Sequence, residues 1–466
     1  MNPSATARAR AALAELPAEI ATTDPDILAG YARDQSQFTP SETPAAMLAP
    51  RTTAEVATAM TALHRHGVPV VPRGAGSGLS GAANATADSV VLSLHRMDAI
   101  LEVDPANRLA VVQPGVVTAA LRERASGAGL AYPPDPGSVE FATIGGNVAT
   151  NAGGMCCVKY GVTGDFVLGL EVVLADGRVV RTGRRTVKGV AGYDLTRLFV
   201  GSEGTLGVIT EVTVRLVPAP RPAHTLVASF AALPDAGRAV TAVVEDGLTP
   251  SMMEILDRTT VRAVDAMSGM GLGDEVHALL LIQSDDPDAA EVLARVEHLC
   301  ERHGAVDVAI SADRAEGAML LEARRLALPA LERLGDWLLD DVSVPRSRIA
   351  ELIAFVEEVA ARSGLTIGVF GHAGDGNLHP TIVFDDADPA ARAAARGAFD
   401  EITERALHLG GTITGEHGVG RLKSGWLAVE QGPVGMDLHA SVKAALDPAG
   451  ILNPCAVMPR EAAGSR

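Results

Sequence analysis

The chain has 466 residues, of which 47% are hydrophobic and 21% are charged, and its 57 acidic and 39 basic residues give a formal net charge of −18. This length allows two or three domains, and the composition is that of a globular protein rather than a disordered one. A surface this negative repels phosphate backbones and anionic membranes, so no nucleic-acid partner is expected. An acidic enzyme that acted on a small anion would have to gather positive charge locally at its site.

No targeting or transmembrane segment is predicted. Residues 1–20 lack the apolar core of a secretory signal, and the longest aliphatic runs, such as 278–282, are too short to span a bilayer. The four cysteines include the adjacent pair Cys156-Cys157 and no C-x-x-C pattern, which favours neither a disulfide framework nor a zinc ribbon. We therefore expect a cytoplasmic protein with reduced thiols.

The first half of the chain predicts short elements separated by glycine-rich segments. A helical arm covers residues 1–39, and the capping-box pattern at residues 52–55 begins a helix that Gly67 ends. The other predicted elements are strands at 68–71, 90–94 and 108–113, a helix at 116–126, a hairpin formed by 166–174 and 178–182, and a strand at 208–217.

The proline-rich segment 218–222 is the strongest linker in the chain, and we place the main domain boundary there. Beyond it, predicted strands alternate with long Ala/Arg/Glu helices, which indicates a helix-covered antiparallel sheet in an α+β domain. The predicted strands are 225–230, 278–283, 366–371 and 378–384, and the predicted helices are 289–303 and 348–363. The predicted parts of the chain are an arm at 1–39, domains at 40–218 and 219–459, and a tail at 460–466.

Three glycine-rich segments indicate a bound ligand. Residues 76–81 fit G-x-G-x-x-G, but a polar stretch and a strand follow instead of a helix, which argues against a Rossmann fold. Glycines let backbone N–H groups approach a pyrophosphate, although a tight turn would explain this loop equally well. Two further glycine-rich loops, 143–154 and 201–210, could wrap an extended ligand together with the first. Because glycines in loops cost chain entropy, a ligand is the better explanation for all three.

Histidines mark the second half of the chain. His372 and His379 lie seven residues apart across a glycine-rich turn, and Glu416 directly precedes His417. Two converging histidines and a carboxylate match a His₂Glu site for zinc or a similar divalent ion. Surface or packing roles are the alternative for histidines beside a turn, and the sequence leaves this open.

Five motifs together resemble the vanillyl-alcohol-oxidase/PCMH flavoprotein superfamily. They are residues 72–81, 144–154, 159–161, 192–195 and 201–207. The similarity is greatest to the branch of glycolate oxidase D-subunits, D-lactate dehydrogenases and D-2-hydroxyglutarate dehydrogenases, and it runs from about Pro40 to Pro459. It implies an α+β fold with a PCMH-type FAD-binding domain of two subdomains at 40–218. An FAD-linked oxidase C-terminal domain at 219–459 would then carry the substrate and metal sites.

The resemblance implies an elongated FAD, and because the loop 73–81 has no His or Cys to tether it, we expect the FAD to be non-covalent. The residues implied for FAD binding are Pro72, Arg73, Gly74, Ala75, Gly76, Ser77, Gly78, Leu79, Pro136, Ser138, Thr143, Gly145, Gly146, Asn147, Thr150, Asn151, Gly154, Glu203, Gly204, Gly207, Ile209 and Asn453.

The same resemblance assigns His372, His379 and Glu416 as ligands of a divalent metal, expected to be Zn or Mn. It assigns His417 as the general base, and a neutral histidine is well suited to take an alcohol proton near pH 7. Adjacent residues on an extended segment point opposite ways, so Glu416 could face the metal while His417 faces the substrate. By resemblance, Arg324 is the clamp for a substrate carboxylate, although most arginines on Ala-rich helices are solvated. Asn377 is implied as a second substrate or flavin contact.

The implied activity is FAD-dependent oxidation of a small 2-hydroxy acid, such as D-lactate or glycolate, to the 2-oxo acid by hydride transfer to flavin N5. Where the hydroxyglutarate branch has a Thr and a Lys that read the distal carboxylate, this chain has Leu328 and Leu339, which favours a short or apolar substrate. The electron acceptor stays open among a quinone, a cytochrome, an electron-transfer flavoprotein and oxygen, and a homodimer is possible.

Several alternatives remain at this point. They are a D-2-hydroxyglutarate dehydrogenase, an oxidase, a non-redox synthase on the same scaffold, and a flavin-binding subunit of a larger glycolate oxidase complex. The intact pairs His372/His379 and Glu416-His417 argue against a non-catalytic subunit, which would have no chemical need for them.

Overall fold

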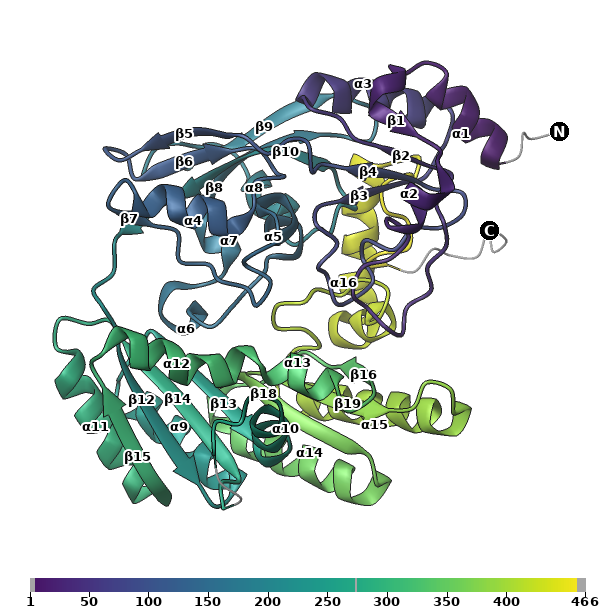
Figure 1. Ribbon diagram of the computed structural model, residues 1–466. Helices are drawn as coiled ribbons and strands as arrows, with labels where there is room; N and C mark the ends of the chain where they lie inside the picture. The colour runs from purple at the N-terminus through teal and green to yellow at the C-terminus, as the bar shows by residue number, and fades with distance from the viewer. Residues whose placement is uncertain (1–4, 273–274, 459–466) are drawn as a thin grey trace. The chain divides into compact units, whose positions relative to one another are not determined.

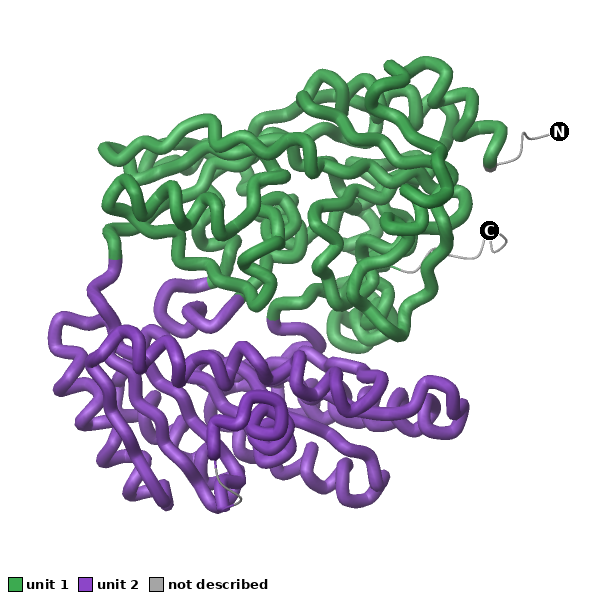
Figure 2. The backbone as a smooth tube through the Cα atoms, viewed as in Figure 1, with its two compact units in different colours: residues 1–153, 162–219, 416–466 green, residues 154–161, 220–415 purple. Residues whose placement is uncertain are grey.

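The computed structural model describes residues 5–272 and 275–458, which form two compact units (Figures 1 and 2). The first unit contains residues 1–153, 162–219 and 416–466, and the second contains residues 154–161 and 220–415. Each unit thus includes a segment from a distant part of the sequence. The C-terminal residues from 416 onward return to the first unit, and the short stretch 154–161 joins the second.

The first unit contains two main sheets. A four-stranded sheet has the order β1 (Ala21–Thr22), β2 (Ala46–Leu48), β4 (Val90–Ser93), β3 (Val70–Arg73), and β2, β4 and β3 run parallel. A five-stranded antiparallel sheet has the order β5 (Ile100–Asp104), β6 (Leu109–Val112), β10 (Val208–Arg215), β8 (Val167–Val173), β9 (Val179–Gly183). A short pair, β7 (Leu130–Ala131) and β11 (Val217–Pro218), completes the strands.

The helices of the first unit are mostly short. They are α1 (Ala5–Leu13), η1 (Ala18–Ile20), α2 (Pro25–Ala29), α3 (Thr53–Arg65), α4 (Thr118–Ser126), α5 (Ile144–Thr150), α7 (Thr163–Phe166), α8 (Leu195–Phe199) and α16 (Ser424–Leu446). Helix α3 confirms the helix predicted from the capping pattern: the Thr52 hydroxyl accepts a hydrogen bond from the Glu55 N–H at 3.2 Å. The Glu55 carboxylate accepts from the N–H of Arg51 instead of Thr52.

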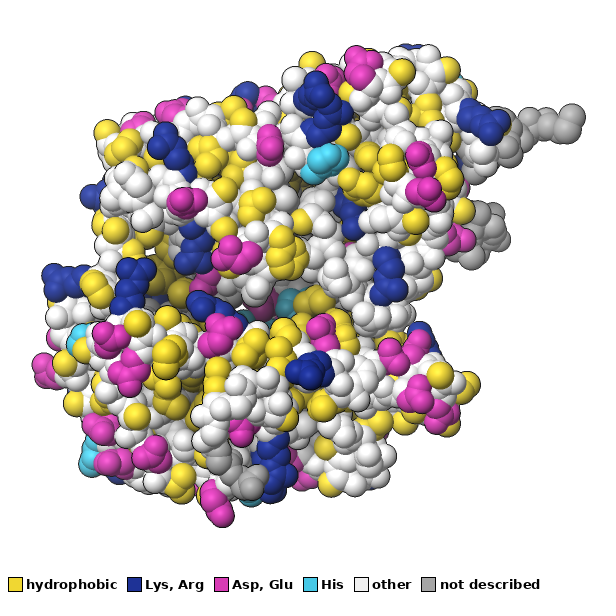
Figure 3. Space-filling model, viewed as in Figure 1, with side chains coloured by type: hydrophobic (Ala, Val, Ile, Leu, Met, Phe, Trp, Pro, Cys, Tyr) yellow, Lys and Arg dark blue, Asp and Glu magenta, His cyan; other side chains and the backbone are white. Residues whose placement is uncertain are grey.

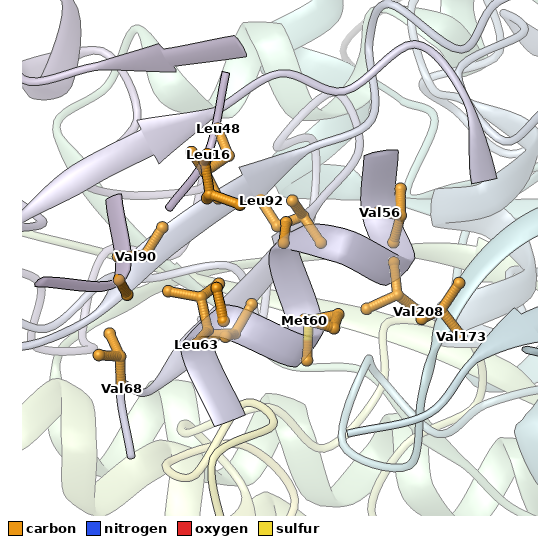
Figure 4. Close-up of a cluster of buried hydrophobic side chains, with 14 of the residues drawn as sticks. Leu16, Leu48, Val56, Met60, Leu63, Val68, Val90, Leu92, Val173 and Val208 are labelled. Carbon is orange, nitrogen blue, oxygen red and sulfur yellow. The ribbon is translucent and has the colours of Figure 1, made fainter. Parts of the chain in front are cut away.

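The core of the first unit lies where α3 packs between its two sheets (Figure 4). Met60 and Leu63 on α3 are fully buried, as the helical spacing predicts. They belong to one cluster with residues of the parallel sheet and of the five-stranded sheet, among them Leu92 on β4 and Val208 on β10. This helix therefore joins the two sheets into one hydrophobic core, and the loops of the unit connect the elements that form this core.

The second unit is built on one eight-stranded sheet in which every pairing is antiparallel. Its order is β15 (Ala305–Ser311), β12 (His224–Phe230), β14 (Ala278–Ser284), β13 (Met252–Asp257), β18 (Thr366–His372), β19 (Asn377–Phe384), β16 (Asp336–Leu339), and β17 (Val342–Ser343) also pairs with β19. Its helices are α6 (Cys157–Tyr160), α9 (Leu233–Glu245), α10 (Arg258–Ser268), α11 (Ala289–Arg302), α12 (Arg314–Arg325), α13 (Ala327–Glu332), η2 (Arg346–Arg348), α14 (Ile349–Ser363) and α15 (Pro389–His408).

Helices cover this sheet because both of its faces are apolar. Helices α10, α12 and α13 share a cluster with alternate strand residues, such as Leu256 on β13 and Leu281 on β14. The intervening residues Ile255 and Leu280 are also fully buried. Side chains alternate between the faces of a strand, so both faces are covered. The predicted α+β architecture with a helix-covered antiparallel sheet is confirmed.

Two local predictions need correction. Residues 143–154 were expected to form a loop, but 144–150 form helix α5, because the Thr143 hydroxyl accepts from the Gly146 N–H and caps the first turn. Asn151, in the left-handed region at φ 53°, ends it. The N-terminal arm is only partly helical, since β1 pairs with β2.

The described part of the chain contains no helix that is long and apolar enough to cross a membrane. On the face that Figure 3 shows, acidic and basic side chains are interspersed over both units. The excess of acidic residues is therefore spread over this face and does not form one continuous patch.

Asp257 offers a test of the second unit's stability. It is buried at the N-terminus of α10, where its carboxylate accepts from the Thr260 N–H at 2.8 Å, and burial raises the pKa of Asp257 to about 6. A folded pKa above the unfolded value means that the stabilisation present below about pH 4 is lost as the pH rises through 6.

Asp257→Asn keeps a good capping residue and removes the charge. Relative to this variant, the wild type should lose roughly 1–3 kcal/mol of unfolding free energy between about pH 4 and 6 and stay level above. Urea denaturation of both proteins across this range measures the difference, and parallel stability curves would contradict the assignment.

Candidate functional site

The three predicted glycine-rich segments meet in the first unit. The second segment contacts the third through backbone hydrogen bonds from Gly201 N–H to Val148 O at 2.9 Å and from Glu203 N–H to Ala149 O at 2.8 Å. Gly74, which precedes the first segment by two residues, lies against the second segment, because a Cβ on Gly74 would lie 2.5 Å from Thr143 Oγ1. The segments separated in sequence thus form one continuous surface of backbone and small side chains.

Several of these glycines are required by close packing. A Cβ on Gly145 would lie 2.4 Å from Pro114 Cβ and 2.9 Å from Pro114 O, and one on Gly204 would lie 3.0 Å from Pro72 Cγ. Real Cβ atoms do not approach other atoms this closely, so any larger residue would push the segments apart. The close approach explains why the sequence uses glycine at these positions.

Arg73 and Asn453 bind backbone carbonyls of the chain on either side of the first segment and near it. The buried Arg73 guanidinium donates to Arg33 O at 2.9 Å and to Ala83 O at 3.3 Å. The Asn453 amide donates to Ala82 O at 2.9 Å and to Glu203 O at 2.8 Å. Both side chains therefore hold loop carbonyls, a supporting role that the sequence does not reveal.

A fourth segment, residues 416–421, joins the same surface. The Ser80 hydroxyl donates to His417 O at 3.0 Å, and the Glu203 carboxylate accepts from the N–H groups of Val419 at 2.7 Å and Gly420 at 2.9 Å. Burial raises the pKa of Glu203 to about 7. A Cβ on Gly153 would lie 2.4 Å from Glu416 Oε2, so the Glu416 carboxylate rests against this glycine.

In the second unit, the β18–β19 hairpin brings His372 and His379 together. Phe370 is opposite His379 and His372 is opposite Asn377 in the hairpin register, so all four side chains share one face. The two imidazole rings lie 5.1 Å apart between centroids, and both histidines are buried. The predicted convergence across the turn is therefore produced by the register, although residues seven apart on a single strand would face opposite sides.

The fully buried carboxylate of Glu254 on β13 connects one histidine with Arg324. Glu254 Oε1 lies 2.7 Å from His372 Nδ1, and Glu254 Oε2 accepts a hydrogen bond from Arg324 Nε at 2.5 Å. In this contact the Glu254 carboxylate is the acceptor and His372 Nδ1 is the donor. The Arg324 guanidinium also lies over the Phe370 ring, 4.8 Å from its centroid.

A second buried carboxylate, Asp341, lies beside the other histidine. Asp341 Oδ1 lies 3.7 Å from His379 Nδ1 and accepts from Asn377 Nδ2 at 2.7 Å. Asp341 Oδ2 accepts from Thr414 Oγ1 at 2.6 Å and from the Gly415 N–H at 3.0 Å. The predicted site residue Asn377 thus anchors Asp341, and the chain leading to Glu416 is tied to the same carboxylate.

The candidate residues divide between the units. His372, His379, Asn377, Arg324 and Gly154 belong to the second unit. Glu416, His417 and the other residues implied for FAD binding belong to the first. Within the first unit, Pro136 and Ser138 precede α5, and Gly207 and Ile209 lie at the start of β10.

Sequence reasoning missed Glu254 and Asp341. Glu254 lies inside the strand Met252–Asp257, whose residues are all buried, and a carboxylate within an apolar strand is costly unless it is paired. A charged residue inside an apolar strand was therefore the feature of the sequence that could have pointed to Glu254. Asp341 follows two leucines of β16 in the same way, but no spacing in the sequence connects it with His379.

Comparison with known proteins agrees with this architecture. Residues 44–183 match the model of the FAD binding domain, and residues 219–457 match that of the FAD linked oxidases, C-terminal domain. The chain is 44% identical to glycolate oxidase subunit GlcD of Bacillus subtilis, over 90% of each chain. It is 35% identical to a D-lactate dehydrogenase of Anaerostipes hadrus, over 91% of each chain.

Among solved structures, p-cresol methylhydroxylase with substrate bound matches with a TM-score of 0.78 and 18% identity, covering 98% of each chain. This likeness shows the fold and confirms the PCMH-type architecture predicted from the motifs. The matches to both family models and the identity with full-length relatives confirm the predicted resemblance as well. The chain therefore belongs to the FAD-linked oxidase family and is an FAD-dependent oxidoreductase.

Proposed function

We propose that this oxidoreductase converts a small 2-hydroxy acid to the 2-oxo acid, with non-covalent FAD and a divalent metal ion. The observation that carries the proposal is the Glu254 carboxylate, which binds His372 and Arg324 at once. It places a metal-ligand nitrogen and a guanidinium side by side, as a substrate with adjacent hydroxyl and carboxylate groups requires. Relatives named glycolate oxidase subunit and D-lactate dehydrogenase support the same substrate class.

The glycine-lined surface of the first unit fits FAD. Gly74, Gly145 and Gly204 keep the segments close together, and glycines, which have no side chain, let an extended phosphate-bearing ligand approach the backbone. When bound, FAD would supply the hydride acceptor. Arg73–Gly81 contains no His or Cys, which supports a non-covalent cofactor.

The buried histidine pair fits a divalent metal such as Zn or Mn. Metal-bound histidines usually donate their second ring N–H to a carboxylate, and Glu254 occupies that position at His372. Gly415 is hydrogen bonded to Asp341, and consecutive Cα atoms are about 3.8 Å apart, so chain connectivity supports Glu416 as the third ligand. The metal would supply Lewis-acid polarisation of the substrate oxygens.

The remaining roles fall to Arg324 and His417. Arg324 would bind the substrate carboxylate through its outer nitrogens, because Glu254 already holds Nε. His417 would take the hydroxyl proton, while C2 loses its hydrogen with the bonding electron pair and the C–O bond becomes a carbonyl. The two electrons would then pass to an external acceptor, which belongs to one of four classes: a quinone, a cytochrome, an electron-transfer flavoprotein or oxygen.

The surroundings of Arg324 favour a short or apolar substrate. Leu339 is buried in the same cluster as Phe370, and Leu328 packs against that cluster. Neither leucine can pair with a second carboxylate, so a dicarboxylic acid would bury an unpaired charge if its chain reached them. We therefore propose a substrate of the lactate or glycolate type rather than 2-hydroxyglutarate.

A substrate screen with a dye acceptor tests this proposal. The purified protein should carry flavin absorbance and oxidise D-lactate or glycolate with kcat/KM at least about tenfold above that for D-2-hydroxyglutarate, because an unpaired buried carboxylate costs well over 1.4 kcal/mol. Prolonged treatment with a chelator should remove turnover, and added Zn²⁺ or Mn²⁺ should restore it.

The control is the same chelated protein dialysed without added metal, whose FAD content should stay unchanged. Equal activity before and after complete metal removal would contradict the metal's role. A preference for the dicarboxylic acid would contradict the assignment of Leu328 and Leu339.

A further inference from the structure

Glu203 is a buried carboxylate that the family resemblance implies for FAD binding, and the proposed reaction gives it no direct chemical role. Its side chain projects from a backbone with φ 51°, a left-handed conformation that non-glycine residues rarely adopt. The backbone is fixed on both sides, because Glu203 N–H donates to Ala149 O at 2.8 Å and Glu203 O accepts from Asn453 at 2.8 Å. Unusual backbone conformations of this kind persist where the surroundings over-determine them, often at functional sites.

Both carboxylate oxygens of Glu203 bind the segment that follows His417. Oε1 accepts from the Val419 N–H at 2.7 Å, and Oε2 accepts from the Gly420 N–H at 2.9 Å. A Cβ on Gly418 would lie 2.9 Å from Oε1, so the carboxylate lies directly against the backbone of this turn. Glu203 is only 5% exposed, and each of its carboxylate oxygens accepts a hydrogen bond from a backbone N–H group.

The turn after His417 needs an external support. Gly418 and Gly420 have φ values of 84° and 52°, and glycine loses more conformational freedom on ordering than any other residue. On the other side, the Ser80 hydroxyl donates to His417 O at 3.0 Å. Ser80 thus holds the carbonyl of His417, and Glu203 holds the N–H groups two and three residues further along the chain.

We propose that Glu203 is a positioning residue for His417, acting through the Gly418–Gly420 turn rather than by binding the flavin or the substrate. This inference rests on the proposed role of His417 as the base. Reaction rates depend steeply on the position of a catalytic group, and a misplacement of about 1 Å can cost on the order of 100-fold. Loss of the two hydrogen bonds from Glu203 to this turn should therefore slow the chemical step and leave substrate binding almost unchanged.

Glu203→Gln tests the proposal, because it keeps the volume but replaces one acceptor oxygen by an NH₂ group that faces a backbone N–H. In anaerobic stopped-flow experiments with D-lactate or glycolate, we expect the limiting rate of flavin reduction to fall at least about tenfold, with the substrate Kd within about twofold of wild type. Glu203→Asp, one methylene group shorter, is a second variant that keeps the charge and should act in the same direction.

Glu171→Gln is the matched control, since Glu171 is a buried carboxylate of the same unit that lies on β8, outside the glycine-rich segments, and accepts a hydrogen bond from Thr53 Oγ1. It should lower Tm but leave the reduction rate of the FAD-loaded protein unchanged. A wild-type rate in FAD-loaded Glu203→Gln and Glu203→Asp would overturn the inference. So would a loss of FAD affinity with no change in the rate of the loaded fraction, because that result assigns Glu203 to cofactor binding alone.

The double variant His417→Ala/Glu203→Gln separates this inference from the proposed function. If Glu203 acts through His417, the double variant should be about as slow as His417→Ala alone. Additive losses would overturn the positioning role. A wild-type rate in His417→Ala alone would instead contradict the proposed function, which the Glu203 variants do not test.

Discussion

Changing His372 to alanine is expected to abolish metal-dependent turnover. The variant loses an imidazole that Glu254 holds in place, and we expect metal affinity to fall by more than about 100-fold, beyond the loss typical for a supporting residue. Metal content after dialysis, measured by mass spectrometry, and activity at rising Zn²⁺ or Mn²⁺ concentrations give the result. Full metal content and wild-type turnover in His372→Ala would contradict the ligand role.

Glu254→Gln should give a graded version of the same effect. The glutamine oxygen can still accept from His372 Nδ1–H, but the charge that makes the imidazole a stronger ligand is gone, so metal affinity should fall about 10- to 100-fold. Because the same carboxylate holds Arg324, the KM for the 2-hydroxy acid should rise as well.

Glu322→Gln is the control for this change. Glu322 lies on the same helix as Arg324, but it is paired only loosely with Arg325, at 3.7 Å, and is largely exposed. Surface pairs of this kind contribute little, so metal content and KM should match the wild type. Equal effects of Glu254→Gln and Glu322→Gln would show that the loss comes from surface charge and would contradict the bridging role.

Sequence patterns correctly predicted the elements that depend on residues close together in the chain. The capping residue Thr52 and the spacing of Met60 and Leu63 predicted α3 within two residues at either end. The glycine-rich segments were predicted to surround one ligand, and the structure brings them together in the first unit. The helix at residues 144–150 was missed because its glycines disfavour a helix. In the folded protein the Thr143 cap and the burial of Ile144 and Val148 together offset that cost.

Contacts between distant strands could not be predicted in the same way. The pairing of His372 with His379 depends on the hairpin register, in which Phe370 is opposite His379. Glu254 is 118 residues from His372 along the chain and reaches it because β13 pairs with β18 in the sheet. No single-strand pattern encodes such pairings, so the proposed ligand residues could be assigned from motifs while the carboxylates beside them could not.

Replacing His417 with alanine should reduce the limiting rate of flavin reduction by about 10²- to 10⁴-fold, the range over which a positioned general base accelerates proton transfer. The substrate Kd should change little, because the proposed carboxylate clamp Arg324 is intact. Anaerobic stopped-flow absorbance with saturating D-lactate or glycolate measures both quantities. Added imidazole should partly restore the rate, since it can take the hydroxyl proton in place of the missing ring.

The exposed His439 on α16 provides the control, because its ring bonds only to Gly435 O within its own helix. His439→Ala should reduce flavin at the wild-type rate. Metal and FAD contents of His417→Ala must match the wild type, since His417 follows the proposed ligand Glu416 and a loss of metal would mimic the loss of the base. With both contents intact, near-wild-type reduction by every 2-hydroxy acid tested would show that the proton goes elsewhere. If flavin reduction in His417→Ala is slow and added imidazole makes it faster, the His417 ring acts as the base.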